Sequence, residues 1–206
     1  MPRVVTAGVP SLNPDGFSHN NFLKVAGVKY IVLPTSKGTN QLFENKHAFD
    51  RAFIVHDCVT VENDTEAIKM LKDSSFDPSQ KVIITGDITY SPIDPSRESV
   101  IESLTNTEKG VTIIADFRSP GFLVLAENWV PYWKAYVDGK SVTIHRAYGT
   151  FMCVECPEGN HEINFTFQSS PYENGKKLTL ASLVFIIVSL AVTGVSYKVK
   201  GKKKIA

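Results

Sequence analysis

The sequence predicts an α+β protein: a small α/β unit, then an antiparallel Ig-like β-sandwich, then a C-terminal transmembrane helix. Three observations lead to this fold class. Helix and strand patterns alternate over residues 18–95, short strands separated by turns recur from about residue 98, and residues 178–197 carry no charge. The predicted parts are an extracytoplasmic α/β unit (1–95), the sandwich (96–172), the membrane span (178–197) and a basic cytoplasmic tail (198–206).

Two helices and three strands make up the predicted α/β unit. A short helix over SHNNFLKVAG starts near Ser18 and ends at Gly27, and a second helix is capped by Asn63 or Asp64. The predicted strands are VKYIVLP (28–34), RAFIVHDCVTV (51–61) and KVIITG (81–86). We expect residues 51–61 to form one continuous strand. The proline-containing linker SPIDPS closes the unit.

Seven short strands follow in the predicted sandwich. They are SVIESLT, GVTIIADF, GFLVLAENW, KAYVD, KSVTIHR, TFMCVEC and HEINFTFQ. Turn signals separate them, and Asp138-Gly139 fits a type I′ hairpin turn. Strands this short and this closely spaced are typical of an antiparallel sandwich.

Residues 178–197 read LTLASLVFIIVSLAVTGVSY. As a helix this segment is roughly 30 Å long, which matches the hydrocarbon core of a bilayer. A buried core helix is the alternative, although core helices of this length normally keep a polar face. Five lysines follow the segment and two precede it, so the positive-inside rule places the tail in the cytoplasm and residues 1–177 outside.

The N-terminal stretch MPRVVTAGVPSLNPDG has no apolar region of the kind found in signal peptides. A lone tail anchor would leave the N-terminal part in the cytoplasm and carry five lysines across the membrane, against the charge rule. We therefore expect upstream transmembrane helices, of the same or a neighbouring chain, to deliver this segment outside. In this interpretation the chain is the end of a longer multispan protein.

The charge balance and the cysteines indicate no cofactor. With 22 basic and 21 acidic residues, the chain gives no indication of a nucleic-acid partner. Cys153 and Cys156 form a C-x-x-C motif, which can mark a redox pair or half of a zinc site. A strand, however, points residues three apart to opposite faces. We favour packing roles for these two and for Cys58, with a disulfide or metal role as the alternative.

An aromatic segment, WVPYWKAYVDGK, occupies residues 129–140. Strand alternation places Trp133 on the core face and Tyr136 on the outer face, beside a bend at Pro131. Exposed rings next to a carboxylate suit carbohydrate, because rings stack on sugar faces and acids accept hydroxyl hydrogen bonds. The alternative is that Trp133 packs the core and Trp129 seals the loop. The candidate ligand-binding residues are Glu127, Trp129, Tyr132 and Tyr136.

These segments together resemble the YfhO-type bacterial membrane proteins. In that family a strand LLVLSE leads to YYPGWKAYVDGK and then to VPAGHHRVEFRY; here the matching stretches are FLVLAENWVPYWKAYVDGK and VECPEGNHEINFTF. Upstream, FLKVAGVKYIVLP and RAFIV resemble the family's LLGVKYVI and RAFVV. The resemblance runs from about residue 18 to the final helix. Where the family has Pro-Gly-Trp this chain has Pro131-Tyr132-Trp133, so the local backbone or surface should differ.

The resemblance implies a multispan GT-C-type glycosyltransferase that takes sugar from a polyprenyl-phosphate carrier and acts on cell-envelope glycans or polymers. In such enzymes the catalytic acid lies in an early extracytoplasmic loop that has no counterpart here, so we assign no catalytic residue. We expect a non-catalytic extracytoplasmic C-terminal part of such an enzyme. The alternatives are a stand-alone, membrane-anchored carbohydrate- or partner-binding module and a truncated remnant without activity. The expected partners are the lipid bilayer, upstream transmembrane helices and an envelope glycan.

Overall fold

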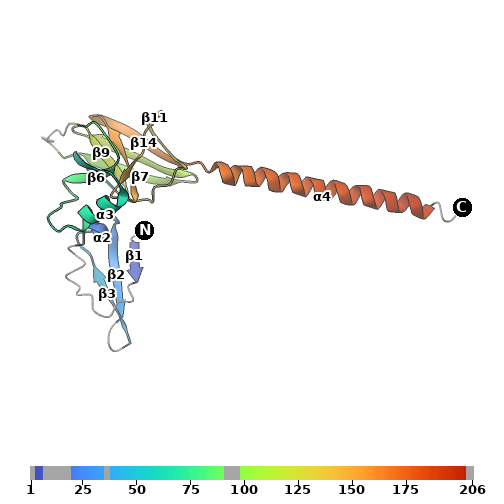
Figure 1. Ribbon diagram of the computed structural model, residues 1–206, viewed down its shortest axis with the longest axis horizontal. Coiled ribbons are helices and arrows are strands. Elements are labelled where there is room, and N and C mark those ends of the chain that lie inside the picture. The colour runs from blue at the N-terminus through green and yellow to red at the C-terminus, as the bar shows by residue number, and fades with distance from the viewer. Residues whose placement is uncertain (1–2, 7–19, 35–37, 91–97, 203–206) are drawn as a thin grey trace. The chain divides into compact units, whose positions relative to one another are not determined.

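The computed structural model describes residues 3–6, 20–34, 38–90 and 98–202, and within these ranges it describes the side chains of residues 20–190. Two compact units divide the chain, Met1–Phe167 and Gln168–Ala206. The described strands and two short helices belong to the first unit, and the second unit contains one long helix (Figure 1). The fold is of the α+β class that the sequence predicts.

The described strands of the first unit form three sheets. The three-stranded sheet has the order β1-β2-β3 and contains β1 (Arg3–Thr6), β2 (Val28–Pro34) and β3 (Asn40–Glu44). The five-stranded sheet, β11-β10-β14-β8-β7, contains β7 (Val100–Thr107), β8 (Gly110–Phe117), β10 (Trp133–Val137), β11 (Lys140–Val142) and β14 (Gly159–Phe167). The six-stranded sheet, β4-β9-β13-β12-β6-β5, contains β4 (Ala52–Val55), β5 (Asp57–Val61), β6 (Lys81–Thr85), β9 (Gly121–Leu125), β12 (His145–Ala147) and β13 (Phe151–Cys156).

The six-stranded sheet is central because it contributes to both hydrophobic cores. Leu123 and Val154 join a core with residues of the five-stranded sheet, such as Ile113. The alternate residues Val124 and Cys153 join a second core on the other face, because successive side chains of a strand point to opposite faces. The second core also takes in buried residues of β2 and of the helices α2 (Asn21–Val25) and α3 (Asp64–Lys72).

The predicted single strand over 51–61 is wrong in one respect. It is divided into β4 and β5 at His56, and these consecutive strands form the two opposite edges of the six-stranded sheet. The sheet therefore curls until its edges meet at that residue. Because the apolar pattern continues through His56, nothing local in the sequence signals the corner.

Contacts from distant residues hold the corner. The Tyr90 hydroxyl lies 3.0 Å from the His56 carbonyl oxygen and 2.9 Å from the Pro120 carbonyl oxygen, so its single proton is shared between two acceptors. The imidazole Nδ1 of His56 lies 3.0 Å from the same Pro120 oxygen and 3.1 Å from the Ser119 hydroxyl. Gly121 is needed for this close approach, because a Cβ there would lie 2.7 Å from His56 Nδ1.

The predicted helices are confirmed, with one difference in capping. Asn20 caps α2, since its side chain accepts from the Leu23 N–H; Ser18, near which the helix was predicted to start, lies outside the described residues. Asn63 caps α3 in the same way through the Glu66 N–H. The chain leaves α2 through Gly27, whose φ of +64° favours glycine.

The predicted Asp138-Gly139 turn is also confirmed. Both residues have positive φ, +50° and +76°, and they join β10 to β11 as an antiparallel hairpin. The Asp138 carboxylate accepts a hydrogen bond from His161 at 2.6 Å and another from the Glu162 N–H at 3.0 Å. These two hydrogen bonds lower the pKa of the Asp138 carboxyl below its usual value.

Other strands differ from the prediction. The stretch KSVTIHR forms two strands in different sheets, β11 and β12, and strands β1 and β3 were not predicted from the sequence. The six-stranded sheet takes strands from both sides of the boundary predicted near residue 95. The predicted linker over 91–96 lies outside the described residues.

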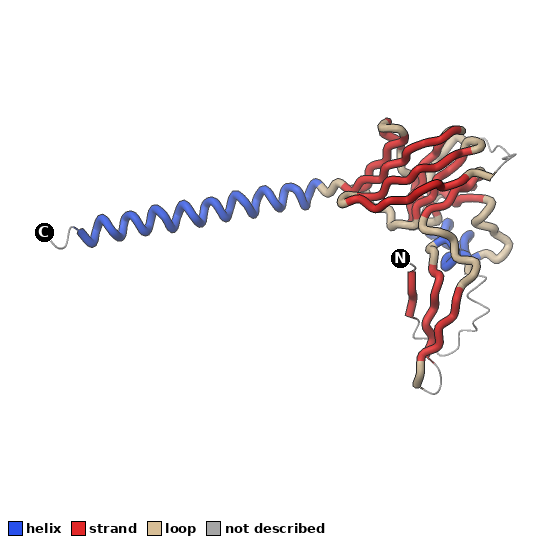
Figure 2. Tube along the Cα trace, turned by 180° about the vertical axis from the view of Figure 1, so that it is seen from behind, coloured by secondary structure: helices blue, strands red, loops and turns tan. Residues whose placement is uncertain are grey.

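Helix α4 (Ser170–Lys202) contains the predicted membrane span, and Figure 2 shows it as one continuous helix. Within the described residues, no helix is both long and apolar enough to cross a membrane. The side chains of residues 191–197, in the second part of the predicted span, lie outside the described part.

The hydrogen bonds of Tyr90 at the His56 corner predict that the protein loses stability at alkaline pH. Burial raises the pKa of the Tyr90 phenol to about 12, above the value of about 10 expected in an unfolded chain. A raised pKa means that this contribution to stability is complete below about pH 10 and is lost as the pH rises through about 12. We expect Tyr90→Phe to lower the free energy of unfolding by about 1 kcal/mol at pH 8, because one hydroxyl hydrogen bond is lost. Above pH 10, the stability of this variant should fall less steeply than that of the wild type.

Denaturant unfolding of the full chain in detergent, at neutral and alkaline pH, checks this prediction. Tyr148→Phe is the matched comparison, since burial also raises the pKa of the Tyr148 phenol. Its hydroxyl donates to the carbonyl groups of Pro78 and Lys81. A Tyr90→Phe chain that loses stability in base as steeply as the wild type would contradict the assignment.

Candidate functional site

The four candidate ligand-binding residues lie on the segment that leaves β9 and enters β10. Two of them, Glu127 and Trp129, are in the connecting loop, where the Trp129 N–H donates to the Thr150 carbonyl at 2.7 Å. Tyr132 immediately precedes β10, and Tyr136 lies within it. The structure gives each of the four side chains a different set of partners.

The Glu127 carboxylate is held by an arginine. Arg51 donates from Nε at 3.0 Å and from Nη2 at 2.9 Å to the same Glu127 oxygen. Arg51 Nη1 also donates to the Asn106 side-chain oxygen at 2.6 Å. Arg51, which precedes β4, thus links this segment both to β7 and to the candidate loop. It also neutralises the Glu127 carboxylate that would otherwise be available to accept from a sugar hydroxyl.

The Trp129 ring is covered on one face. The Arg146 guanidinium lies 4.1 Å from the ring centroid, in cation–π geometry. Arg146 also forms an ion pair with Asp64, the first residue of α3, and Asp64 accepts from the Thr85 hydroxyl at 2.9 Å. The other part of Trp129 packs against the core shared by the two larger sheets. This indole therefore seals the loop and offers little free face for stacking.

Tyr132 and Trp133 meet a third ring, Phe167, at the end of β14. Phe167 lies 6.1 Å from Tyr132 and 5.4 Å from Trp133 between ring centroids, in edge-to-face geometry. Trp133 packs against the core, as the alternation predicted, whereas Tyr132 is exposed. Tyr132 is the residue that stands where the family pattern has glycine, so this exposed ring is a departure from that pattern.

Tyr136 lies on the outer face of the five-stranded sheet, where the alternation of β10 placed it, because its neighbours Ala135 and Val137 are buried. Its partner across the strand pair is Asn164 of β14. The Asn164 amide accepts from the Thr112 hydroxyl at 2.6 Å and donates to the Glu162 carboxylate at 2.6 Å. A partly exposed phenol ring therefore lies beside an ordered row of hydroxyl, amide and carboxylate groups.

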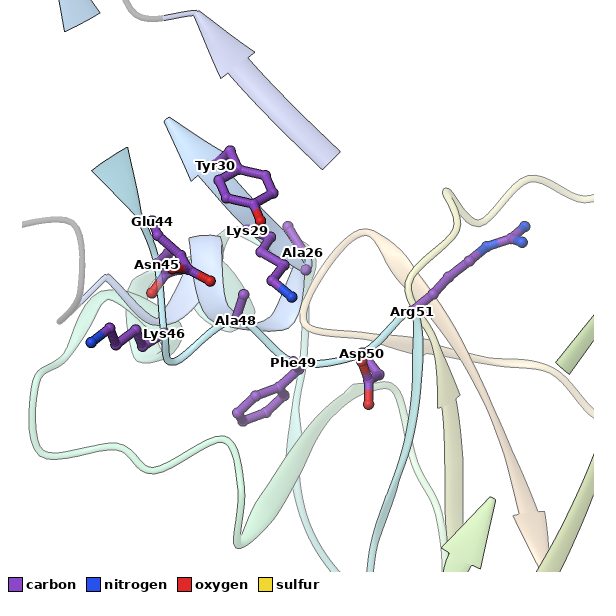
Figure 3. Close-up of a pocket in the computed structure, with 11 residues that line it drawn as sticks. Ala26, Lys29, Tyr30, Glu44, Asn45, Lys46, Ala48, Phe49, Asp50 and Arg51 are labelled. Carbon is purple, nitrogen blue, oxygen red and sulfur yellow. The ribbon is translucent and has the colours of Figure 1, made fainter. Parts of the chain in front are cut away.

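A pocket that the sequence analysis did not predict lies between the end of α2, strand β2 and the β3–β4 connection. It has a volume of about 680 Å³. Its charged lining residues, drawn in Figure 3, are Lys29, Glu44, Lys46, Asp50 and Arg51. Figure 3 shows the Arg51 guanidinium extending away from the other labelled side chains, in keeping with its ion pair to Glu127. No sequence signal pointed to this pocket because residues from separate elements form it.

The Asn45 side chain in this pocket is already used by the fold. Its amide donates to the Val28 carbonyl at 3.0 Å, and its oxygen accepts from the His47 N–H at 3.2 Å. The charged lining mixes both signs without a convergent set of donors. The pocket is large enough for a sugar-sized ligand, but its polar groups do not select one.

The cysteines behave as the strand argument predicts for residues three apart. Cys153 lies in the core with the helices and Cys156 in the core with the five-stranded sheet, so they point to opposite faces of β13. Burial raises the pKa of Cys156 to about 12 and raises that of Cys153 further. All three cysteines, including Cys58, are free thiols. Within the described residues, no group of three or more His, Cys, Asp or Glu side chains could hold a metal ion.

Residues 99–179 match the family model described as the bacterial membrane protein YfhO. This part of the chain is similar to the YfhO family. The matched region contains all five strands of the five-stranded sheet, strands β9, β12 and β13, and the start of α4. No curated protein and no solved structure matches the chain. The description of that family as a membrane protein supports an association of this chain with a membrane.

The Arg146 contacts predict a measurable loss of stability in the YfhO-type chain. Arg146→Gln removes the cation–π contact with Trp129 and the ion pair with Asp64. Since both partners of that pair are about one-third exposed, we expect a loss of about 1–2 kcal/mol in the free energy of unfolding. High salt should reduce the difference.

Arg118→Gln is the matched control for chemical denaturation of the full chain. Arg118 pairs with Asp116 at 2.6 Å, but its side chain is 46% exposed, so its replacement should cost less than about 0.5 kcal/mol. Equal losses in the two variants would show that Arg146 does not link the candidate loop to α3.

Proposed function

We propose that this chain is a non-catalytic extracytoplasmic part of a membrane glycosyltransferase of GT-C type, acting on cell-envelope glycans or polymers with a polyprenyl-phosphate sugar donor. In this proposal the two packed sheets are the Ig-like sandwich predicted from the sequence, and residues 178–197 cross the bilayer. The observation that carries the proposal is the YfhO match, which extends from the sheets into the start of α4.

The exposed surface of α4 supports the membrane span. Nine large apolar side chains between Leu178 and Leu190 are exposed, with relative exposures of 53–73%. They are distributed around the helix rather than gathered on one face, and a helix that is apolar all round is typical of a buried or membrane-spanning environment. The lysines that follow the span would then remain in the cytoplasm.

The outer face of the five-stranded sheet supports glycan binding. Tyr136 supplies a ring for a sugar face, and Asn164, Glu162 and Thr112 supply fixed donors and acceptors beside it. Of the other candidate residues, Tyr132 keeps an exposed ring, whereas Trp129 and Glu127 are engaged by arginines. We therefore propose Tyr136 as the residue on which binding of an acceptor or carrier glycan depends most.

The topology can be tested by cysteine labelling in intact cells of the producing organism. In a Cys58→Ser background, Lys140→Cys places a thiol on the exposed β10–β11 hairpin, and Lys203→Cys places one in the basic tail. A membrane-impermeant maleimide should label the first site in intact cells and the second only after permeabilisation. Labelling of both sites, or of the tail alone, in intact cells would refute the proposed orientation.

Glycan binding can be tested with the purified full chain in detergent and isolated envelope polymer. We expect Tyr136→Ala to weaken binding up to about tenfold, since a well-oriented aromatic contact is worth about 0.5–1.5 kcal/mol beyond its buried area and 1.4 kcal/mol is a tenfold change in affinity. Tyr136→Phe should bind within about twofold of the wild type because it keeps the ring. Isothermal titration calorimetry gives the affinities, and equal binding by the alanine variant excludes this face.

A transfer assay separates the proposal from its alternative. The chain alone should show no sugar transfer from a polyprenyl-phosphate donor, and transfer should appear when the chain is present with the membrane helices encoded beside it. Glycan binding with no dependence of transfer on this chain would favour the stand-alone, membrane-anchored binding module.

A further inference from the structure

Three aromatic side chains gather at one end of the five-stranded sheet: Tyr132, Trp133 and Phe167. We call them the aromatic cluster. Phe167 contacts both other rings edge-on, at centroid distances of 6.1 Å and 5.4 Å. Trp133 packs against the core and so anchors the cluster, while Tyr132 and Phe167 remain 37% and 41% exposed. Two exposed rings held in place by a partly buried one form a fixed apolar surface rather than scattered exposed residues.

Two exposed lysines border the aromatic cluster. The Lys109 carbonyl accepts a hydrogen bond from the Phe167 N–H at 2.7 Å, so the β7–β8 turn lies directly beside the ring. Lys134 follows Trp133 and pairs across the sheet with Thr166. Glu108 is an exposed acid in the same turn. This end of the sheet thus combines exposed rings with an excess of positive charge.

The opposite end of the same sheet has the opposite character. The β10–β11 turn carries Asp138, and Glu158 and Glu162 are exposed beside it at the start of β14. Strand β10 separates the two ends by five residues, or roughly 16 Å at about 3.3 Å per residue. Lys140 lies in that turn as well. The sheet is therefore polarised, with aromatic and basic groups at one end and mainly acidic groups at the other.

The chain itself limits how far the aromatic cluster can lie from the apolar part of α4. Phe167 ends β14, α4 begins at Ser170, and Leu178 is the first residue of the apolar stretch. A short linker and eight helical residues span at most roughly 25 Å. If α4 is the membrane anchor, as proposed above, the cluster lies within reach of the headgroup layer.

We propose that the aromatic cluster is a second membrane contact that binds an anionic phospholipid surface. Tyr132 and Phe167 enter the interface, where aromatic rings are favoured, and Lys109 and Lys134 meet lipid phosphates. The acidic end of the sheet then faces away from the membrane. This inference rests on the proposed anchoring by α4 and adds a fixed orientation of the sheets relative to the bilayer.

A local probe on the full chain tests the contact. Tyr132→Cys, in a Cys58→Ser background, is labelled with an environment-sensitive fluorophore, and Lys140→Cys at the opposite end of β10 is the matched control. The chain is reconstituted into vesicles of phosphatidylcholine alone or of an equimolar mixture with phosphatidylglycerol, each carrying headgroup nitroxide lipids. We expect several-fold stronger quenching at position 132 than at 140, strongest in the mixed vesicles.

Charge reversal gives a second test, with the same label at position 132. Lys109→Glu with Lys134→Glu should remove the extra quenching that phosphatidylglycerol causes, while Lys140→Glu should leave it unchanged. Equal quenching at positions 132 and 140 overturns the contact. A spectral shift at 132 without quenching by lipid nitroxide also overturns it, since a protein surface would then cover the cluster.

Vesicle flotation separates this inference from the proposed anchoring. A chain that floats with the vesicles but shows no quenching at position 132 overturns the contact alone. A chain that does not float overturns the membrane span and the contact together.

Discussion

The one-residue corner at His56 is the constraint on which the first unit depends. Two consecutive strands can form opposite edges of one sheet only if the sheet curls until those edges meet. The Tyr90 hydroxyl, the Pro120 carbonyl and the absent side chain of Gly121 make that meeting possible. Once the sheet is curled, one face packs on the helices and the other on the five-stranded sheet, and both cores follow from it.

Much of the local structure could be predicted from the sequence because its causes are local. The cap at Asn63, the turn at Asp138-Gly139 and the alternation from Trp133 to Val137 each depend on a few neighbouring residues. The corner at His56 could not be predicted in this way, since the Tyr90 hydroxyl and the Pro120 carbonyl that hold it lie 34 and 64 residues away. Likewise, the division of KSVTIHR into two strands depends on which sheet each half joins.

The candidate site shows the same limit. Its residues were found from composition and alternation, but their partners were not. Arg51 is 76 residues from Glu127, and Arg146, which covers Trp129, is itself held by Asp64, 82 residues away. These arginines make Glu127 and Trp129 parts of the structural framework. The two tyrosines remain, on different surfaces, one beside a polar row on the sheet and the other at the sheet's end. The aromatic segment therefore serves several purposes, and its residues are not equivalent.

Strand β13 limits where this fold can accept insertions and deletions. Its neighbouring residues Cys153 and Val154 belong to different cores. Adding or losing a single residue in this strand would exchange every side chain between the two interiors at once. Lineages that carry this fold should therefore vary in loop length while keeping the length of β13 constant, whatever glycan or lipid they meet.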